Sequence, residues 1–318
     1  MLKSGKHPPF DSGNHQPAIP DQEKRVSMEL FIQQLVSGIS IGAIYALLAV
    51  GYALVYSVYN FTNWAFDAFM AFGAFMAFVA ISSLAMPFWL AMILSIILTI
   101  ILSVGSESLA YRPLRARKAP RLFMMISAMG VNLAVVNIIN LIFGGTFRKF
   151  PVESVQPIFV GNVSIGRMDL IAGAISFGVL ALLWLFLYRT RWGLGIRASA
   201  IDIQTASLMG INNNAVAIII FVITGVLSSI AGVFYGIKYA VFPMMGIVTI
   251  KAMIASIVGG LGSLPAAIVG SMLLGVLETL VSGYISSSYR DLFSFLFLII
   301  ILLFFPNGLM GKNVDEKL

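Results

Sequence analysis

The residues of this chain with most scope for chemistry are a few ionisable side chains set inside long apolar segments. Asp67 lies just after Asn63 in an aromatic-rich segment, and Lys251 and Glu278 lie in two later apolar segments. A charged group in hydrocarbon costs a few kcal/mol, so it normally faces a cavity or a partner. If the segment of Asp67 instead starts at the membrane surface, its carboxylate merely complements the dipole of a helix N-terminus. The sequence leaves both interpretations of Asp67 open.

Sequence motifs for catalysis and cofactor binding are missing. The chain contains no GxxxxGK[ST] phosphate loop, no HExxH zinc motif and no GxSxG nucleophile motif. It has no cysteine, and its two histidines, His7 and His15, lie in the N-terminal tail. The glycine cluster at 259–262 is not a dinucleotide fingerprint, because apolar membrane segments flank it rather than a βαβ unit. We therefore expect no enzymatic activity, metal site or cofactor on this chain, and any ATP that drives transport must bind another subunit.

The elements that must position these residues are membrane-spanning helices. Apolar residues make up 59% of the 318 residues and charged residues 10%, against about 25% charged residues in soluble domains. Uncharged runs such as 203–237 and 252–277 exceed the roughly 20 residues that a spanning helix needs. Because hydrocarbon offers the backbone no hydrogen bonds, these runs must be helical. We predict an all-α polytopic bundle of about eight or nine spans, one of them an interrupted or half-span helix between Lys238 and Ser263.

Basic residues set the predicted orientation and the domain boundaries. Five of them fall between Arg112 and Arg121 with no acid, which places this loop in the cytoplasm and, counting backwards, the N-terminus outside. Because the net charge of +7 resides largely in such loops, we expect no nucleic-acid partner. We expect a disordered tail at 1–27, absent if translation starts at Met28, then a membrane domain at 28–311 and a cytoplasmic tail at 312–318.

A polar, basic segment at 189–214 separates two long apolar runs. Ser199 and Asp202 fit a capping box and Gly210 fits a helix stop, which predicts a helix of about 15 Å over Ala200–Met209. This helix is too short to span a bilayer, and the arginines around it place it in the cytoplasm. From the residues alone it is either a docking element for a soluble partner or a solvated loop helix.

Glycines mark the places where helices are expected to pack closely. Gly38 and Gly42 have the small-xxx-small spacing that lets another helix approach. We assign the same packing role to the cluster formed by Gly259, Gly260 and Gly262.

Several motifs together resemble the permeases of branched-chain amino acid ABC importers. The resemblance covers about residues 29–311, in order and with similar spacing. The matching segments are SGISIGAIYALLAVGYALVY at 37–56, Glu107 with YRPLR at 111–115, ASLMGIN at 206–212, GGLGS at 259–263 and FPNGL at 305–309.

The resemblance implies a subunit with a type II ABC importer-like fold in the bacterial cytoplasmic (inner) membrane. Its implied partners are a second related permease, two cytoplasmic ATPases that bind ATP and Mg, and an extracytoplasmic solute-binding protein. The predicted helix at 200–209 looks like the element that docks in an ATPase groove. Its coupling residues would be Ser199, Asp202, Ala206 and Gly210.

One departure from the family pattern concerns the start of the second span. Residues 63–67 read NWAFD where these permeases usually read NFAHG, so a bulkier wall with an acid replaces a small polar one. If this stretch lines the path, the cargo is either a branched-chain amino acid or a related solute such as a short amide. Lys251 and Glu278 match the family pattern and could pair, contact a zwitterionic cargo or pack a helix interface. The candidate path residues are Asn63, Phe66, Asp67, Lys251 and Glu278.

A different class of function is also compatible with buried charges in broken helices. A stand-alone ion-coupled secondary transporter or channel could use Asp67, Lys251 and Glu278 as ion sites. A membrane scaffold would fit the glycine-rich packing but leaves the buried charges unexplained. The short cytoplasmic helix favours the importer, because neither alternative has an ATPase to dock.

Overall fold

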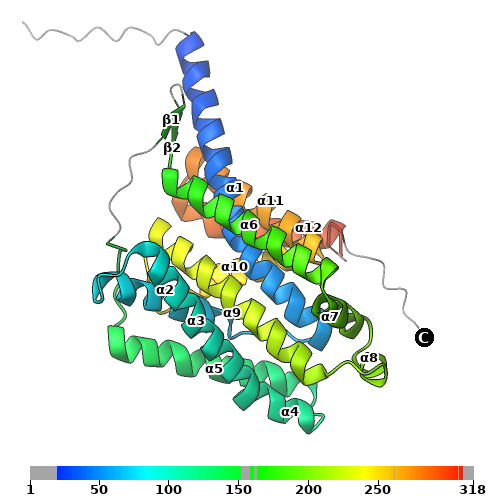
Figure 1. Ribbon diagram of the computed structural model, residues 1–318. Helices are drawn as coiled ribbons and strands as arrows, with labels where there is room; N and C mark the ends of the chain where they lie inside the picture. The colour runs from blue at the N-terminus through cyan, green and yellow to red at the C-terminus, as the bar shows by residue number, and fades with distance from the viewer. Residues whose placement is uncertain (1–19, 152–157, 161–162, 261, 307, 311–318) are drawn as a thin grey trace, which may run out of the picture.

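The computed structural model describes residues 20–151, 158–160, 163–260, 262–306 and 308–310. Nearly all of this part of the chain is helical, as the apolar runs predict (Figure 1). A short antiparallel hairpin, β1 with β2, interrupts the helices. The longer helices are α1 (Pro20–Tyr59), α2 (Phe66–Ser82), α3 (Phe88–Ser106), α5 (Arg121–Phe143), α6 (Arg167–Arg189), α9 (Asn213–Lys238), α10 (Gly246–Gly259), α11 (Leu264–Tyr284) and α12 (Arg290–Phe304), and the shorter elements are η1 (Glu107–Tyr111), α4 (Arg112–Ala116), β1 (Ile158–Val160), β2 (Val163–Ile165), α7 (Arg191–Ile201), α8 (Ile203–Leu208) and η2 (Ser287–Tyr289).

The lengths of the helices confirm a multi-pass membrane bundle with broken elements. In the described part of the chain, seven helices are long and apolar enough to cross a membrane, and α2 and α10 are shorter apolar helices. Helix α10 has 14 residues and is the half-span helix that the glycine clusters predict. Helix α2 begins only at Phe66, because residues 60–65 enter the bundle without helical structure.

The N-terminal boundary differs from the sequence prediction. Helix α1 begins at Pro20, within the segment at 1–27 for which composition predicts disorder. Extending an existing helix by one residue costs far less than nucleating a new one, so a 40-residue helix can run past its apolar part. Residues 1–19 and 311–318 lie outside the described residues, so their predicted disorder and cytoplasmic location stay predictions.

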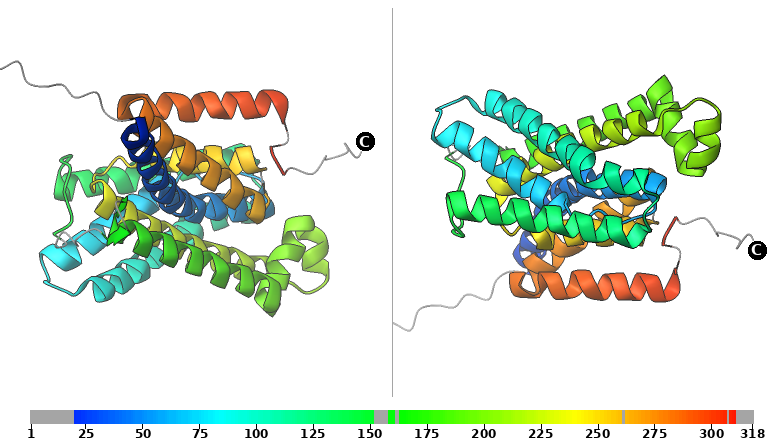
Figure 2. Two further views of the ribbon diagram at one scale, coloured as in Figure 1. Left: turned by 90° about the horizontal axis from the view of Figure 1, so that it is seen from above. Right: turned by 90° about the horizontal axis from the view of Figure 1, so that it is seen from below.

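Helix α1 forms the centre of the bundle. It runs between α11 and α12 on one side and α2, α3 and α9 on the other (Figure 2). Two of the predicted packing glycines lie at its contact with α11: a Cβ at Gly38 would lie 2.8 Å from the Cα of Val276, and one at Gly42 would lie 3.0 Å from the Cα of Met272. Close backbone approach of this kind is how small residues join membrane helices.

The glycines after α10 serve two different purposes. Gly259 packs against the backbone of Ala266, as predicted. Gly260 and Gly262 have φ angles of 130° and 82°, a backbone region that favours glycine. A Cβ at Gly262 would meet its nearest atoms, those of Ser57 and Tyr56, at 3.9 Å, so the positive φ angle is the stronger reason for glycine at this turn into α11.

The bundle has two chemically different ends. Around one end lie the basic residues of α4 and α7, and Arg115 of α4 donates from Nη2 to Asn214 Oδ1 of α9 at 3.4 Å. At the other end Arg148 pairs with Val241 in an isolated β-bridge, and Lys238 binds Asp169. By the positive-inside rule we assign the first end to the cytoplasm and call the second the outer end.

Candidate functional site

The segment predicted as one short helix consists of two helices with a sharp break. Helix α7 ends at Ile201, and α8 begins at Ile203. Asp202 is extended between them, with φ −154° and ψ 114°, and its Oδ1 accepts a hydrogen bond from the backbone N–H of Gln204 at 2.9 Å. Asp202 is therefore the N-cap of α8.

The helix cap differs from the predicted one, whereas the helix stop lies where the sequence predicts it. Ser199 lies inside α7 and is 2% exposed, so the predicted capping box is wrong: the cap belongs to Asp202, at the break. Gly210 has φ +88° and ends the segment in the left-handed conformation, which confirms the predicted stop. The Thr205 hydroxyl and then the Gln204 N–H donate to the Asp202 carboxylate and hold its pKa below the ordinary value of 3.8.

The α7–α8 unit presents large apolar side chains outside the spanning helices. Ile201, Leu208 and Met209 are 89%, 87% and 81% exposed, and α7 and α8 project beyond the ends of the neighbouring helices (Figures 1 and 2). Ala206 behaves differently, because it is 4% exposed and its carbonyl accepts from the N–H of Ile211 at 3.1 Å. Ala206 therefore packs α8 against its own chain, and its role in the coupling segment stays a prediction.

Polar contacts tie α8 to the spanning helices. The side chain of Asn213 donates to the carbonyl of Ile203 at 3.3 Å, and the hydroxyl of Tyr59, at the end of α1, lies 3.5 Å from the carbonyl of Asn213. The guanidinium of Arg115 stacks 4.9 Å above the Tyr59 ring and forms a 2.5 Å ion pair with the fully buried Glu107. These contacts join α8, α1 and the start of α9 to the π-helical turn at the end of α3.

The η1 turn also contacts Asn63, which lies in the non-helical break at residues 60–65 before α2. Tyr111, the last residue of η1, donates its hydroxyl to Asn63 Oδ1 at 3.0 Å. The backbone N–H of Ala65 donates to the same oxygen at 3.0 Å. The side chain of Asn63 is fully buried, and among the described residues its Nδ2 has no hydrogen-bond partner.

Asp67 lies inside the bundle rather than at its surface. It is the second residue of α2 and 9% exposed. Its Oδ2 accepts from the Nδ2 of Asn132 at 3.4 Å, and Asn132 lies at the middle of the 23-residue helix α5. A Cβ at Gly246, the first residue of α10, would lie 3.1 Å from Asp67 Oδ2. Of the two interpretations of Asp67, the structure supports the intramembrane one.

Phe66 does not share the environment of Asp67. Its ring is fully buried and stacks on Tyr52, with 4.2 Å between the ring centroids. A Cβ at Gly51 would lie 2.7 Å from this ring. Phe66 thus fills the core between α1 and α2 in this conformation, and its role as a path residue stays a prediction.

Lys251 and Glu278 form a separate, fully paired cluster. Lys251 Nζ lies 2.9 Å from Glu278 Oε1 and 2.6 Å from Asp291 Oδ1. Glu278 also accepts from the hydroxyls of Tyr45 at 2.9 Å and Ser294 at 2.7 Å. The cluster joins α1, α10, α11 and α12, so of the predicted roles the structure supports the charge pair at a helix interface.

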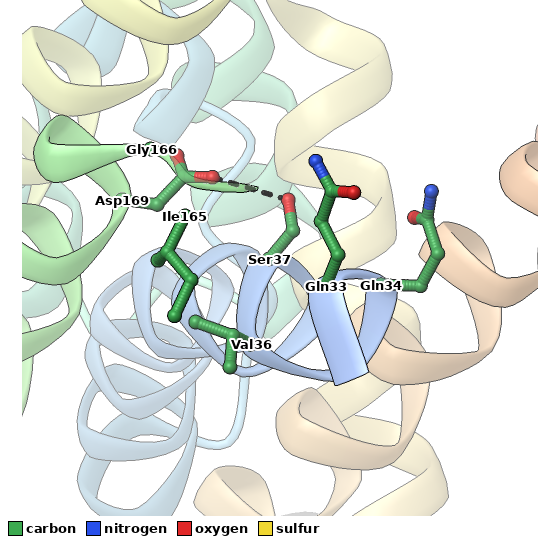
Figure 3. A pocket seen from close by; sticks show the side chains of 7 residues that line it. All are labelled: Gln33, Gln34, Val36, Ser37, Ile165, Gly166 and Asp169. Atoms are coloured by element: carbon green, nitrogen blue, oxygen red, sulfur yellow. Dashed lines mark hydrogen bonds between the residues drawn. The ribbon is translucent and has the colours of Figure 1, made fainter. Parts of the chain in front are cut away.

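A small cavity of about 100 Å³ opens at the outer end, between α1 and the start of α6. Figure 3 shows Ser37 and Asp169 facing each other there, beside Gln33 and Gln34. Ser37 donates to Asp169 Oδ2 at 3.2 Å, and Lys238 Nζ lies 2.7 Å from Asp169 Oδ1. The charged groups of this cavity neutralise each other, and the contacts join α1, α6 and α9.

Several residues of these sites were missed by sequence reasoning. A focus on ionisable groups does not point to Asn132, although an amide in the middle of an apolar span is itself a signal. Tyr111 was noted only as part of a motif. No local pattern indicates that Lys238 and Asp169 meet, because 69 residues separate them.

Comparison with known proteins identifies the family. A family model described as "Branched-chain amino acid transport system / permease component" matches residues 34–303. The high-affinity branched-chain amino acid transport system permease proteins LivH of Salmonella typhimurium and BraD of Pseudomonas aeruginosa are each 35% identical to this chain. These alignments cover 90% of this chain and 97% of LivH or 98% of BraD.

A chain of PsaBC from Streptococcus pneumoniae, in complex with Fab, superposes with a TM-score of 0.49 and 16% identity over 85% of this chain and 90% of its own length. The family assignment depends on the sequence matches, which span most of both proteins. The chain belongs to the family of branched-chain amino acid transport system permease components.

Proposed function

We propose that this permease subunit translocates a small amino acid-like solute, a branched-chain amino acid or a related amide, in an ATP-driven importer of the bacterial cytoplasmic membrane. Its partners would be a second related permease, two ATPases that bind ATP and Mg, and an extracytoplasmic solute-binding protein. The names of the relatives LivH and BraD support the solute class. The observation that carries the partner assignment is the α7–α8 unit with its exposed apolar side chains.

The α7–α8 unit has the properties of a docking element for a soluble protein. Leu208 and Met209 are more than 80% exposed, and they lie beyond the spanning helices on the end assigned to the cytoplasm. Large apolar groups clustered on an exposed surface typically mark an interaction site. An ATPase that binds these side chains would be anchored at one short helix. The ATP-driven closure of the ATPases could then move this helix.

The contacts between α8 and the spanning helices could transmit a movement of α8 into the membrane domain. Asn213, Tyr59 and Arg115 link α8 to the Glu107–Tyr111 turn, and Tyr111 holds Asn63 at the break before α2. We propose that this series of contacts couples movement of α8 to the break, and that the cargo passes beside it. Switching between inward-open and outward-open states then requires each state to make different contacts with the partner ATPases.

The ion-coupled carrier is the weaker candidate. Family membership argues against it, and Lys251 and Glu278, two of its three proposed ion ligands, neutralise each other at 2.9 Å.

Co-purification from native membranes tests the importer function. We expect wild type to carry an ATPase subunit with it, and Leu208→Asp, Asp202→Arg and Gly210→Trp to lose this subunit. Leu84→Asp is the matched control, because Leu84 is likewise an exposed leucine, at 57%, but lies in the turn after α2 at the outer end.

Two outcomes would count against the proposal in different ways. Wild type that carries no ATPase and moves solute by itself along an ion gradient would support the carrier. An ATPase that stays bound to Leu208→Asp and to Gly210→Trp would leave the importer intact but remove docking from α8.

A further inference from the structure

The surroundings of Asp67 indicate which chemical group of the cargo this residue could contact. The carboxylate lies at the start of two helices at once: it belongs to the first turn of α2, and its Oδ2 is the closest atom to a Cβ built at Gly246, the first residue of α10. The N-cap position of α10, Met245, supplies no side-chain hydrogen bond. A carboxylate of the protein itself therefore lies beside the N-terminus of α10, where the helix dipole favours a negative charge, and the donor that it accepts from is Asn132 rather than an α10 N–H.

Two buried acceptor atoms at this site lack a donor in the described part of the chain. Asp67 Oδ1 and Asn132 Oδ1 are both inaccessible and have no hydrogen-bond partner among the described residues. Leaving a buried acceptor unpaired is unfavourable, and intramembrane ionisable residues mark substrate pathways. Two adjacent acceptors, one of them a carboxylate, call for a ligand group that donates N–H bonds.

The same geometry disfavours a ligand that carries a carboxylate. A helix N-terminus inside a membrane is a good site for a substrate carboxylate, but the Asp67 carboxylate already lies beside the N-terminus of α10. In a free α-amino acid the carboxylate is attached to the carbon that bears the ammonium, so the two groups enter a small site together. A carboxylate brought beside Asp67 would meet a like charge where little water screens it.

We propose that Asp67 and Asn132 bind an N–H-donating end of the cargo, an ammonium or a carboxamide, and that Asp67 selects against a free carboxylate there. This inference rests on the proposed function, and it chooses the amide and amine class over the free amino acid. Asp67 thereby acts as a specificity residue of the path.

Binding of matched solutes to the purified permease complex, without its binding protein, tests the inference. L-leucinamide and L-leucine differ only in the carboxamide that replaces the carboxylate, and 4-methylpentanamide lacks the ammonium as well. Equilibrium dialysis should show that wild type binds leucinamide at least about tenfold tighter than leucine, because like charges brought together cost several kcal/mol. If 4-methylpentanamide binds as well as leucinamide, the carboxamide is the recognised group; if it binds more weakly, the ammonium is.

Two substitutions at Asp67 separate charge from shape. Asp67→Asn keeps the volume and should bring the affinity ratio of leucinamide to leucine close to one. Asp67→Gly frees the N-terminus of α10 and should raise the affinity for leucine. Asp169→Asn is the control, because it removes a first-turn carboxylate of α6 at the outer end and should leave the ratio unchanged.

The outcomes separate this inference from the importer itself. Equal binding of leucine and leucinamide by wild type, no binding of either, or a ratio that survives Asp67→Asn would overturn the selectivity. Because dialysis requires no ATP hydrolysis, these results do not depend on the ATPases. Loss of ATPase co-purification would overturn the proposed importer and leave the binding result standing.

Discussion

Two acidic residues in the membrane bundle, Glu278 and Asp67, have opposite surroundings. Glu278 is fully buried and receives a lysine and two hydroxyls within 2.9 Å. Asp67 is 9% exposed and receives one amide at 3.4 Å, with its other oxygen unpartnered among the described residues. A buried charge that is fully paired fixes the position of neighbouring helices, whereas one that lacks partners is available to a ligand.

The position of the two acids agrees with this difference. Glu278 joins four helices, so any change in its pairing would disturb the contacts of α1, α10, α11 and α12 together. Asp67 lies beside two helix ends that begin within the bundle, where the chain is already broken. The paired acid thus belongs to the frame of the protein, and the unpaired acid belongs to the part that we propose contacts the cargo.

The largest effect is expected when the paired acid loses its lysine. Lys251→Met preserves much of the side-chain volume but leaves Glu278 as an uncompensated buried carboxylate, which should destabilise the protein by about 3–5 kcal/mol. The thermal midpoint of the purified complex, measured at one fixed scan rate, should fall accordingly.

A second substitution shows whether charge is the cause. Adding Glu278→Gln to Lys251→Met removes the uncompensated charge and should recover part of the lost midpoint. Asp291→Asn is a milder control, because the Asp291 side chain is 51% exposed. A single Lys251→Met variant as stable as wild type would show that the cluster is not a structural pair.

Substitution of the unpaired acid, Asp67, should hardly change the thermal midpoint. Asp67→Asn retains an oxygen that can accept from Asn132 and removes no ion pair, so the free energy of unfolding should change by less than about 1 kcal/mol. A fall in midpoint as large as that of Lys251→Met would mean that Asp67 is structural, and the comparison between the two acids would fail.

Much of the frame could be predicted from the sequence because it follows from composition. Uncharged runs predict spanning helices, the glycine clusters around 246–262 predict the half-span α10, and the spacing of Gly38 and Gly42 predicts the tight contact with α11. Each of these features is a property of one local stretch of chain, and hydrocarbon enforces the outcome.

The sites were harder to predict because they depend on depth and on distant partners. Phe66 and Asp67 are adjacent in sequence, yet one packs on Tyr52 and the other faces Asn132. Only the tertiary arrangement shows that residues 60–65 are non-helical and bring Asp67 into the bundle. In the same way, Ser199 and Asp202 have capping-box spacing, but packing of α7 buries Ser199 and leaves Asp202 to cap α8.

Asp202 extends the comparison to an acid outside the membrane, where the smallest effect is expected. Its carboxylate accepts from Thr205 and Gln204, and its pKa is held below the ordinary value of 3.8. A lowered folded-state pKa means that the cap contributes its full stability above the unfolded pKa and loses it as pH falls through the folded value. Hydrogen exchange at the amides of α8, corrected for intrinsic rates, should therefore be constant near neutrality and rise only below about pH 4.

Asp202→Asn provides the control for this pH dependence. An asparagine caps a helix about as well as an aspartate but has no carboxyl group to titrate, so exchange in α8 should show no acid step in the variant. An acid step that persists in Asp202→Asn would place the titrating group elsewhere. If the step is lost, an exposed, satisfied acid affects only its own short helix, in contrast to the paired Glu278, whose loss affects the bundle, and the unpaired Asp67, whose loss affects the cargo.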